Sequence, residues 1–180
     1  MDHNDHVALL RAGVVGAGPL WADFGSGWGA FTLALADLLG PGGMIYSLDR
    51  KRDELQRQAR ELRRRFPHVA VHYLIADYRE PLDLPAFDGI VMANTLHYLT
   101  AAELQATLPL VHGYLRPGGR LVVVEYDVEE GTFWLPYPLS WRRWQSVAPA
   151  AGFSTPRLLA TRPSGRNRGF YAALCERPPA

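Results

Sequence analysis

The chain has 180 residues, of which 48% are hydrophobic and 21% are charged, as expected for one globular domain. Its 19 Lys and Arg residues nearly balance its 18 Asp and Glu residues, which excludes a strongly electrostatic nucleic-acid binder as the first interpretation. Lys51 is the only lysine and Cys175 the only cysteine, which excludes a phosphate-binding Gly-Lys-Ser/Thr loop, an intrachain disulfide and a cysteine-rich zinc site.

The sequence contains no stretch of about 18 uninterrupted apolar residues, so we expect no membrane-spanning segment. Asp2 and Asp5 open the chain without a basic cluster, and Arg11 interrupts the first apolar stretch, a pattern unlike a signal peptide. We therefore expect a cytoplasmic protein, either a monomer or a homodimer, that does not bind membranes. His3 and His6 have ligand-like spacing, but chain termini are commonly mobile, so we expect no metal.

Strand and helix patterns alternate along the chain after a short N-terminal lead. Residues 1–19 form this lead, in which Val7–Leu10 is compatible with one or two helical turns before a glycine-rich break. Buried-strand patterns follow at residues 20–24, 44–48, 69–75, 88–93 and 120–126. Helical patterns separate them at residues 31–39, 53–66 and 101–115. Two last strand patterns, at residues 158–160 and 170–174, flank a turn at residues 163–167. They predict a terminal hairpin.

This order of elements predicts an α/β fold with a doubly wound, mostly parallel sheet and helices on both faces. Unbroken apolar runs such as Leu121–Val124 are typical of strands that are covered on both faces. The terminal hairpin requires one strand to run antiparallel. We expect residues 20–180 to form a single domain, because no linker interrupts them.

The sharpest local feature is a glycine-rich loop, residues 23–29, between the first strand and the helix that follows it. Glycines let the backbone approach a ligand, and a helix N-terminus offers free N–H groups. The third glycine comes one residue too early for a dinucleotide-binding fingerprint, which would place it at Ala30. Asp23 would also oppose a pyrophosphate, but it suits a positively charged ligand. Asp49, 24 residues beyond Gly25, ends the second strand, where a carboxylate can accept both ribose hydroxyls.

Six short segments resemble, in order, the motifs of class I S-adenosylmethionine (SAM)-dependent methyltransferases. They are Asp23–Gly29, Asp49, Ala76–Tyr78, Phe87–Asn94, Leu115–Leu121 and Ala151–Phe153. The resemblance implies seven strands in the order 3-2-1-4-5-7-6 with strand 7 antiparallel, SAM as cofactor and S-adenosylhomocysteine (SAH) as its product. It also implies a ligand site at the carboxyl ends of the parallel strands. The motifs are specific for the fold and the cofactor and silent about the acceptor.

The resemblance carries cofactor-binding roles over to a set of residues in these motifs. They are Asp23, Gly25, Ser26, Gly27, Gly29, Asp49, Arg50, Asp77, Tyr78 and Asn94. The glycine loop would pack against the ribose and methionine parts of SAM. Asp23 would hold this loop or reach the methionine ammonium through water, and Asp49 would bind the ribose hydroxyls.

The remaining roles concern the adenine and methionine ends. Asp77 would accept from the adenine amino group, with Tyr78 or Arg50 beside the ring. Asn94 would meet the methionine end. Helix caps at Asp49 and Asn94, and an Asx turn at Asp77, are the alternative structural interpretations.

Methyl transfer needs a general base only when the acceptor keeps its proton. His97 follows the fourth strand on the expected active face and is the candidate for that base, with a contact role as the alternative. The candidates for acceptor binding are Tyr126, Trp134, Tyr137, Arg166 and Arg168. Trp134 and Tyr137 would form a wall for a flat acceptor or merely pin a loop to the core. The hairpin arginines would meet a carboxylate or phosphate on the acceptor.

The leading hypothesis is a SAM-dependent methyltransferase that acts on a small molecule, because the chain shows no separate substrate-recognition module. The alternatives are an RNA or protein methyltransferase with the same core, or a non-catalytic SAM-binding partner subunit. Residues 50–65 carry eight basic side chains against three acidic ones, a pattern more typical of a solvated helix than of a nucleic-acid site. An NAD(P) reductase is the least favoured alternative, since the glycine spacing and the lack of a second lysine argue against it.

Overall fold

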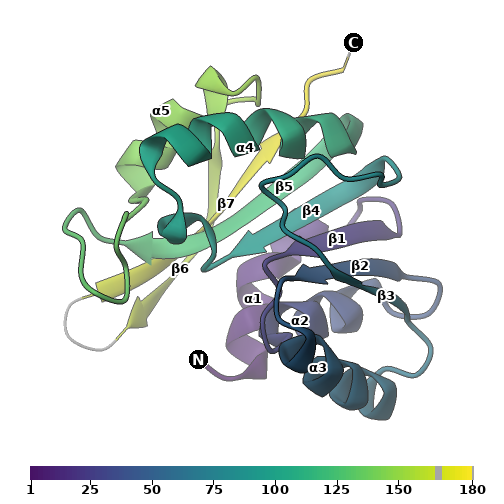
Figure 1. Cartoon of the computed structure of the whole chain (residues 1–180). Coiled ribbons are helices and arrows are strands. Elements are labelled where there is room, and N and C mark those ends of the chain that lie inside the picture. Colours follow the sequence, from purple (N-terminus) through teal and green to yellow (C-terminus); the bar gives the residue numbers. More distant parts are fainter. Residues whose placement is uncertain (165–167, 180) are drawn as a thin grey trace.

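Seven strands form one mixed sheet within residues 1–164 and 168–179, the part of the chain that the computed structural model describes (Figure 1). Their order is β3-β2-β1-β4-β5-β7-β6. Parallel pairing joins β1 to β2 and β4, β2 to β3, and β4 to β5, whereas β7 pairs antiparallel with both β5 and β6. The predicted α/β fold, strand order and antiparallel strand are therefore confirmed.

The elements follow the alternation that the sequence predicts. The strands are β1 (Leu20–Phe24), β2 (Met44–Asp49), β3 (Ala70–Ile75), β4 (Phe87–Ala93), β5 (Leu115–Asp127), β6 (Arg157–Ser164) and β7 (Arg168–Glu176). The helices are α1 (His3–Val14), α2 (Ala30–Leu39), α3 (Arg52–Arg65), α4 (Ala101–Tyr114) and α5 (Trp141–Ala150), with a 3₁₀ turn η1 (Leu96–Tyr98).

The N-terminal helix α1 is longer than the one or two turns that the sequence predicts. Asp2 and Asp5 form a capping box, in which the Asp5 N–H donates to the Asp2 carboxylate over 3.0 Å and the Asp2 N–H to the Asp5 carboxylate over 3.2 Å. Leu9 and Leu10 are fully buried. The N-terminal lead is therefore part of the folded core.

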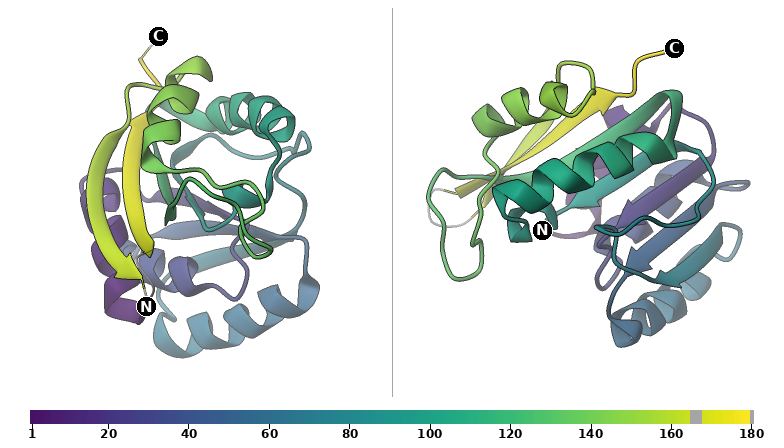
Figure 2. Two further views of the ribbon diagram at one scale, coloured as in Figure 1. Left: turned by 90° about the vertical axis from the view of Figure 1, so that its left-hand side faces the viewer. Right: turned by 45° about the horizontal axis from the view of Figure 1, so that its top comes forward.

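The sheet separates two apolar cores, one on each face (Figure 2). Neighbouring residues of β1 point to opposite faces, so Trp21 packs with α1 and α2, whereas Ala22 packs with α4 and α5. Buried anchors include Leu35 on the first face and Trp144 on the second. Because helices cover both faces, the edge where the parallel strands end is the natural place for a ligand site.

Candidate functional site

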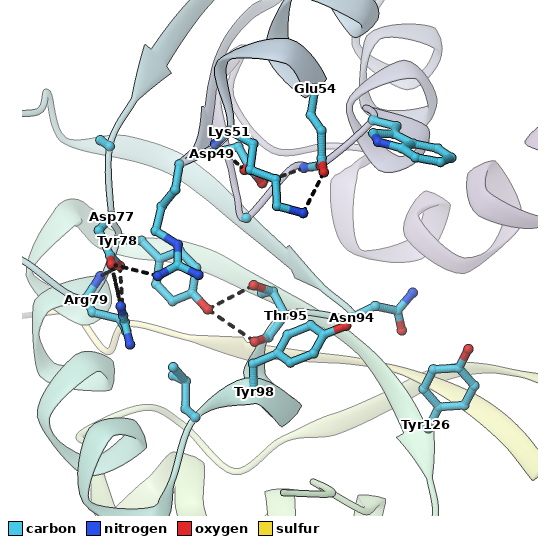
Figure 3. Close-up of a pocket in the computed structure, with 16 residues that line it drawn as sticks. Asp49, Lys51, Glu54, Asp77, Tyr78, Arg79, Asn94, Thr95, Tyr98 and Tyr126 are labelled. Atoms are coloured by element: carbon cyan, nitrogen blue, oxygen red, sulfur yellow. Dashed lines mark hydrogen bonds and ion pairs between the residues drawn. The ribbon is translucent and has the colours of Figure 1, made fainter. Parts of the chain in front are cut away.

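A pocket of about 970 Å³ opens where the parallel strands end (Figure 3). Its lining comes from the glycine loop and from the segments that follow β2, β3, β4 and the end of β5. Several predicted site residues line it, namely Gly25, Gly27, Asp49, Arg50, Asp77, Tyr78, Asn94 and Tyr126. The fold thus collects side chains between positions 25 and 126 at one place.

Close packing explains two glycines of the loop. Gly25 has a φ of 73°, and a Cβ there would lie 2.2 Å from Oγ1 of Thr95. Gly29 has a φ of 84°, and a Cβ there would lie 2.5 Å from the Cβ of Gln58. A side chain at either position would clash and would strain the backbone. Gly29 is the N-cap of α2 and is not part of the pocket lining.

Asp49, at the end of β2, holds the glycine loop in place. The Gly27 N–H donates to Oδ2 of Asp49 and the Lys51 N–H donates to Oδ1, each over 2.9 Å. Each carboxylate oxygen has two lone pairs, so Asp49 retains capacity for hydroxyl donors in the pocket.

Ser26, a predicted cofactor residue, does not line the pocket and instead ties the loop to its neighbours. Its N–H donates to the Leu48 carbonyl over 2.9 Å, and its Oγ accepts from Oγ of Ser47 over 2.8 Å and from Nε2 of Gln58 over 2.9 Å. Gln58 is fully buried on α3 and also donates to the Gly27 carbonyl over 3.1 Å. Ser47 and Gln58 were not predicted from the sequence, and the available signal was a polar residue within an apolar strand for Ser47 and on the apolar stripe of α3 for Gln58.

Asp23 lies in β1 and is not part of the pocket lining. Its side chain is 1% exposed, and the Thr32 hydroxyl donates to Oδ2 over 2.6 Å. Burial raises the pKa of Asp23 to about 7, while the Thr32 hydrogen bond acts in the opposite direction and the nearby Asp49 charge raises it further. Because Thr32 belongs to α2, the contact joins the strand before the glycine loop to the helix after it.

Asp77, directly after β3, is already engaged by two arginines. Nη2 of Arg79 lies 2.6 Å from Oδ2 of Asp77, and Nη1 of Arg50 lies 3.6 Å from the same oxygen. The Arg79 side chain is the main cause that lowers the pKa of Asp77. Arg79 also pairs with Glu103 of α4 over 3.0 Å. Arg79 was not predicted from the sequence as a site residue. A ligand amino group that binds Asp77 would share the Asp77 carboxylate with Arg79.

The segment after β4 contributes a buried acceptor to the site. Asn94 has a φ of 52°, and its Oδ1 is buried and accepts no hydrogen bond within the described residues. Buried polar atoms without a partner are rare and are expected where a ligand supplies the donor. Beside it, the Tyr78 hydroxyl lies 2.9 Å from Oγ1 of Thr95, which joins the segments after β3 and β4 (Figure 3).

His97 lies in η1 and is 3% exposed, and it is not among the residues that line the pocket. Its Nδ1 lies 2.7 Å from Oε2 of Glu125, a fully buried residue near the end of β5. Its ring centroid lies 4.3 Å from that of Tyr98 and 6.2 Å from that of Tyr126, and both tyrosines line the pocket. His97 thus follows β4 as the sequence predicts, but its ring is buried behind the two tyrosines, against a carboxylate, and its role as a base stays a prediction.

Glu125 also orders the backbone after β4. Its Oε1 accepts from the N–H groups of Thr95, Leu96 and His97 over 3.0, 2.8 and 3.3 Å. This role of Glu125 was not predicted from the sequence. The available signal was a carboxylate at the end of a strand that otherwise reads as apolar.

The aromatic residues between β5 and α5 do not reach the pocket lining. Trp134 is 77% exposed and Tyr137 is 43% exposed. Buried Leu135 and Leu139 anchor this segment, and the Tyr137 N–H donates to the His97 carbonyl over 3.0 Å. A role of Trp134 and Tyr137 in acceptor binding therefore stays a prediction.

Arg162 is the hairpin arginine whose side-chain contact the structure describes. Arg166 lies outside the described residues, and Arg168 is the first residue of β7. Nε of Arg162 lies 3.5 Å from Oδ1 of Asp5, so this arginine pairs with α1.

Two further observations concern metals and membranes. In residues 1–164 and 168–179, no group of three or more His, Cys, Asp or Glu side chains is arranged to hold a metal ion. His3 instead lies 2.9 Å from Asp37. No helix in the described part of the chain is both long and apolar enough to cross a membrane.

Comparison with known proteins gives one family match. Residues 22–121 match a family model described as "Methyltransferase domain". No curated protein sequence matches the chain.

Solved structures resemble the chain over almost its full length. Magnesium protoporphyrin IX methyltransferase from Synechocystis PCC 6803 with bound SAM has a TM-score of 0.71 at 17% identity, covering 97% of this chain and 77% of that protein. Burkholderia thailandensis 1,6-didemethyltoxoflavin-N1-methyltransferase has a TM-score of 0.76 at 17% identity, covering 98% and 78%. Human N-acetylserotonin methyltransferase has a TM-score of 0.67 at 18% identity, covering 98% and 51%. At these identities the likeness shows a shared fold.

Proposed function

The chain belongs to the family of methyltransferase domains, the class I SAM-dependent methyltransferases, and we propose that it transfers the methyl group of SAM to a small-molecule acceptor. The observation that carries the proposal is the pocket at the strand ends, where the glycine loop, Asp49 and Asn94 converge. These residues fit the chemistry of SAM, which offers ribose hydroxyls and a methionine ammonium as donors.

Three cofactor-binding residues have distinct proposed roles. Asp49 accepts the ribose hydroxyls with the lone pairs that Gly27 and Lys51 leave unused. Asn94 accepts from the methionine ammonium with its buried Oδ1. Asp77 accepts from the adenine amino group in competition with Arg79.

Catalysis by this chain rests mainly on positioning. SAM, when bound, supplies an electrophilic methyl group that the acceptor attacks in line. Holding both partners in reactive orientation can lower the barrier by about 7–11 kcal/mol. The pocket walls that do this are fixed by Asp49, Glu125 and the Tyr78–Thr95 contact.

His97 is the proposed general base for an acceptor that keeps its proton. A carboxylate at Nδ1 favours the tautomer with its proton on Nδ1 and leaves Nε2 as the acceptor. Such a base adds about 10²–10⁴-fold to the rate. Because the ring lies within the wall, its use requires a small opening between Tyr98 and Tyr126.

The proposal of a small acceptor draws on the related proteins. The names of the three similar enzymes refer to magnesium protoporphyrin IX, 1,6-didemethyltoxoflavin and N-acetylserotonin, which are all small molecules. We propose Tyr126 as an acceptor contact in the pocket and Trp134 and Tyr137 as contacts at its approach. Arg166 and Arg168 stay proposed contacts from the hairpin.

Calorimetry with SAM and SAH tests the proposal. Wild-type protein should bind both saturably, and Asp49→Ala should weaken binding by about tenfold or more, since it removes an acceptor for ribose and for Gly27. Asp83→Asn, which changes an exposed carboxylate outside the pocket lining, is the matched control. If neither SAM nor SAH binds, the cofactor assignment is wrong. If Asp49→Ala leaves the affinity for SAM and SAH unchanged, the ribose role of Asp49 is wrong.

A labelled-methyl screen then tests the acceptor class. Small phenols, amines and carboxylates are compared with bulk RNA and protein. Transfer to small molecules is expected, and transfer to RNA or protein alone would reject the small-molecule proposal.

A further inference from the structure

The charged side chains of the pocket gather at one end. They belong to the segments that include the ends of β2 and β3, namely Asp49, Arg50, Lys51, Glu54, Asp77 and Arg79. The segments after β4 and at the end of β5 contribute only uncharged side chains to the lining. Figure 3 shows Asp77 and Arg79 on one side of the pocket and Asn94 and Tyr126 on the other.

Every cation of the described lining already has a carboxylate partner. Nζ of Lys51 lies 2.8 Å from Oε1 of Glu54. Arg50 and Arg79 both pair with Asp77. The carboxylate beside each cation offsets its charge, which reduces the attraction of this lining for an anionic group on an acceptor.

The uncharged end presents aromatic surface. Tyr98 is 58% exposed although it lines the pocket, and Tyr126 also lines the pocket from the same group of segments. Trp28 of the glycine loop also lines the pocket, but the guanidinium of Arg57 lies 4.5 Å from its ring centroid, so this ring belongs with α3. We call Tyr98 and Tyr126 the aromatic end of the pocket.

Packing fixes the orientation of the two tyrosines. His97 contacts the ring of Tyr98, and Tyr126 packs on Phe170 with ring centroids 4.1 Å apart. The Glu125 carboxylate in turn fixes His97. Exposed aromatic faces held in this way stack on flat rings with little loss of side-chain entropy.

From this division we infer that the methyl acceptor is an uncharged, planar aromatic molecule that binds at the aromatic end. The inference rests on the proposed function, because the cofactor must occupy the charged end. It is an alternative to the expectation that the hairpin arginines meet a carboxylate or phosphate on the acceptor, and the matched ligands below decide between the two.

The test uses SAH-saturated wild-type protein and matched ligands. Calorimetry compares 2-naphthol with 6-hydroxy-2-naphthoate, which adds a carboxylate, and with decahydro-2-naphthol, which removes the aromatic ring. The neutral aromatic compound should bind at least about tenfold more tightly than either analogue. Equal or tighter binding of the carboxylate or the saturated alcohol, or no binding of 2-naphthol at millimolar concentration, would overturn the inference.

Two variants locate the site. Tyr98→Leu and Tyr126→Leu should each weaken 2-naphthol binding by about three- to tenfold, because each removes one aromatic face. Phe66→Leu is the control, since this partly buried ring follows α3 and lies outside the pocket lining. An equal loss in Phe66→Leu would place the ligand elsewhere.

SAH binding by the wild-type protein separates the two proposals. If SAH binds and the naphthol series shows no aromatic preference, only the acceptor class is wrong. If SAH does not bind, the proposed function itself fails.

Discussion

Asp23→Asn should remove a pH dependence of stability that the buried Asp23 carboxyl imposes. Burial raises the pKa of this carboxyl from 3.8 to about 7 in the folded protein. Between these pH values the folded state keeps a proton that the unfolded chain releases. Stability therefore falls as the pH rises from about 4 to about 7 and is constant above, the opposite of the effect of a salt-bridged carboxylate.

The magnitude follows from the size of the pKa shift. A shift of about 3 units, at about 1.4 kcal/mol per unit, corresponds to about 4 kcal/mol of stability lost between pH 4 and pH 8. That is a large share of the 5–15 kcal/mol, roughly, that stabilises a typical domain. Asparagine carries no ionisable proton, and its carbonyl oxygen can still accept the Thr32 hydroxyl.

Urea unfolding between pH 4.5 and pH 8.5, without SAM, is the assay. The free energy of unfolding of Asp23→Asn minus that of the wild type should increase with pH by roughly 3–4 kcal/mol and level off above about pH 7. Asp83→Asn, which changes an exposed carboxylate, should run parallel to the wild type. Parallel curves for Asp23→Asn as well would refute the reasoning, because the Asp23 side chain would then be ionised in the folded protein at low pH.

Three further predictions follow from close packing and burial. Gly25→Ala should lower the unfolding free energy by about 2 kcal/mol or more and weaken SAH binding, because its Cβ would meet Thr95 at a positive φ. Gly113 lies in α4, and a Cβ there would meet nothing within 4 Å. Gly113→Ala should therefore stabilise the protein by about 0.5–1 kcal/mol in the same urea assay. Glu125→Ala should lower the free energy of unfolding by about 3–5 kcal/mol, since it removes the acceptor of the buried backbone N–H groups and of His97. Glu125→Gln should lower it less, because glutamine keeps one acceptor oxygen. Equal losses in the two variants would argue against this geometry. Cys175 is buried, and burial raises the pKa of its thiol. Iodoacetamide at pH 8 should therefore label Cys175 only after unfolding, which mass spectrometry measures. Rapid labelling of the native protein would contradict the burial.

The fold could be predicted because its signals are local. The apolar run Leu20–Phe24 and the glycines that follow it define β1 and its turn within the chain itself. The start of β5 could not be predicted in this way. Its first residue, Leu115, pairs with Phe87 ahead of a register shift at Gly89, and such a pairing depends on a distant strand.

The site was predictable where strand ends alone determine position. Asp49 and Asp77 follow neighbouring parallel strands, which end at one edge of the sheet, and both line the pocket. The partners of these residues were not predictable. Arg79 reaches Asp77 through side-chain geometry, and the contact of Glu125 with His97 joins residues 28 positions apart through the packing of η1 on β5.

The carboxylates at this edge of the sheet serve the same physical purpose, which the alternative interpretation of Asp77 as an Asx turn predicted for one of them. Asp49, Asp77 and Glu125 each accept backbone N–H groups from the loop they adjoin, as in the contacts with Gly27, with Arg79 and with Thr95 to His97. The loops are thus ordered by folding, so their entropy is not lost again when a ligand binds. In such a pocket, selectivity for the acceptor depends on side chains that do not take part in these hydrogen bonds to the loops. In the described lining those side chains include the exposed aromatic rings.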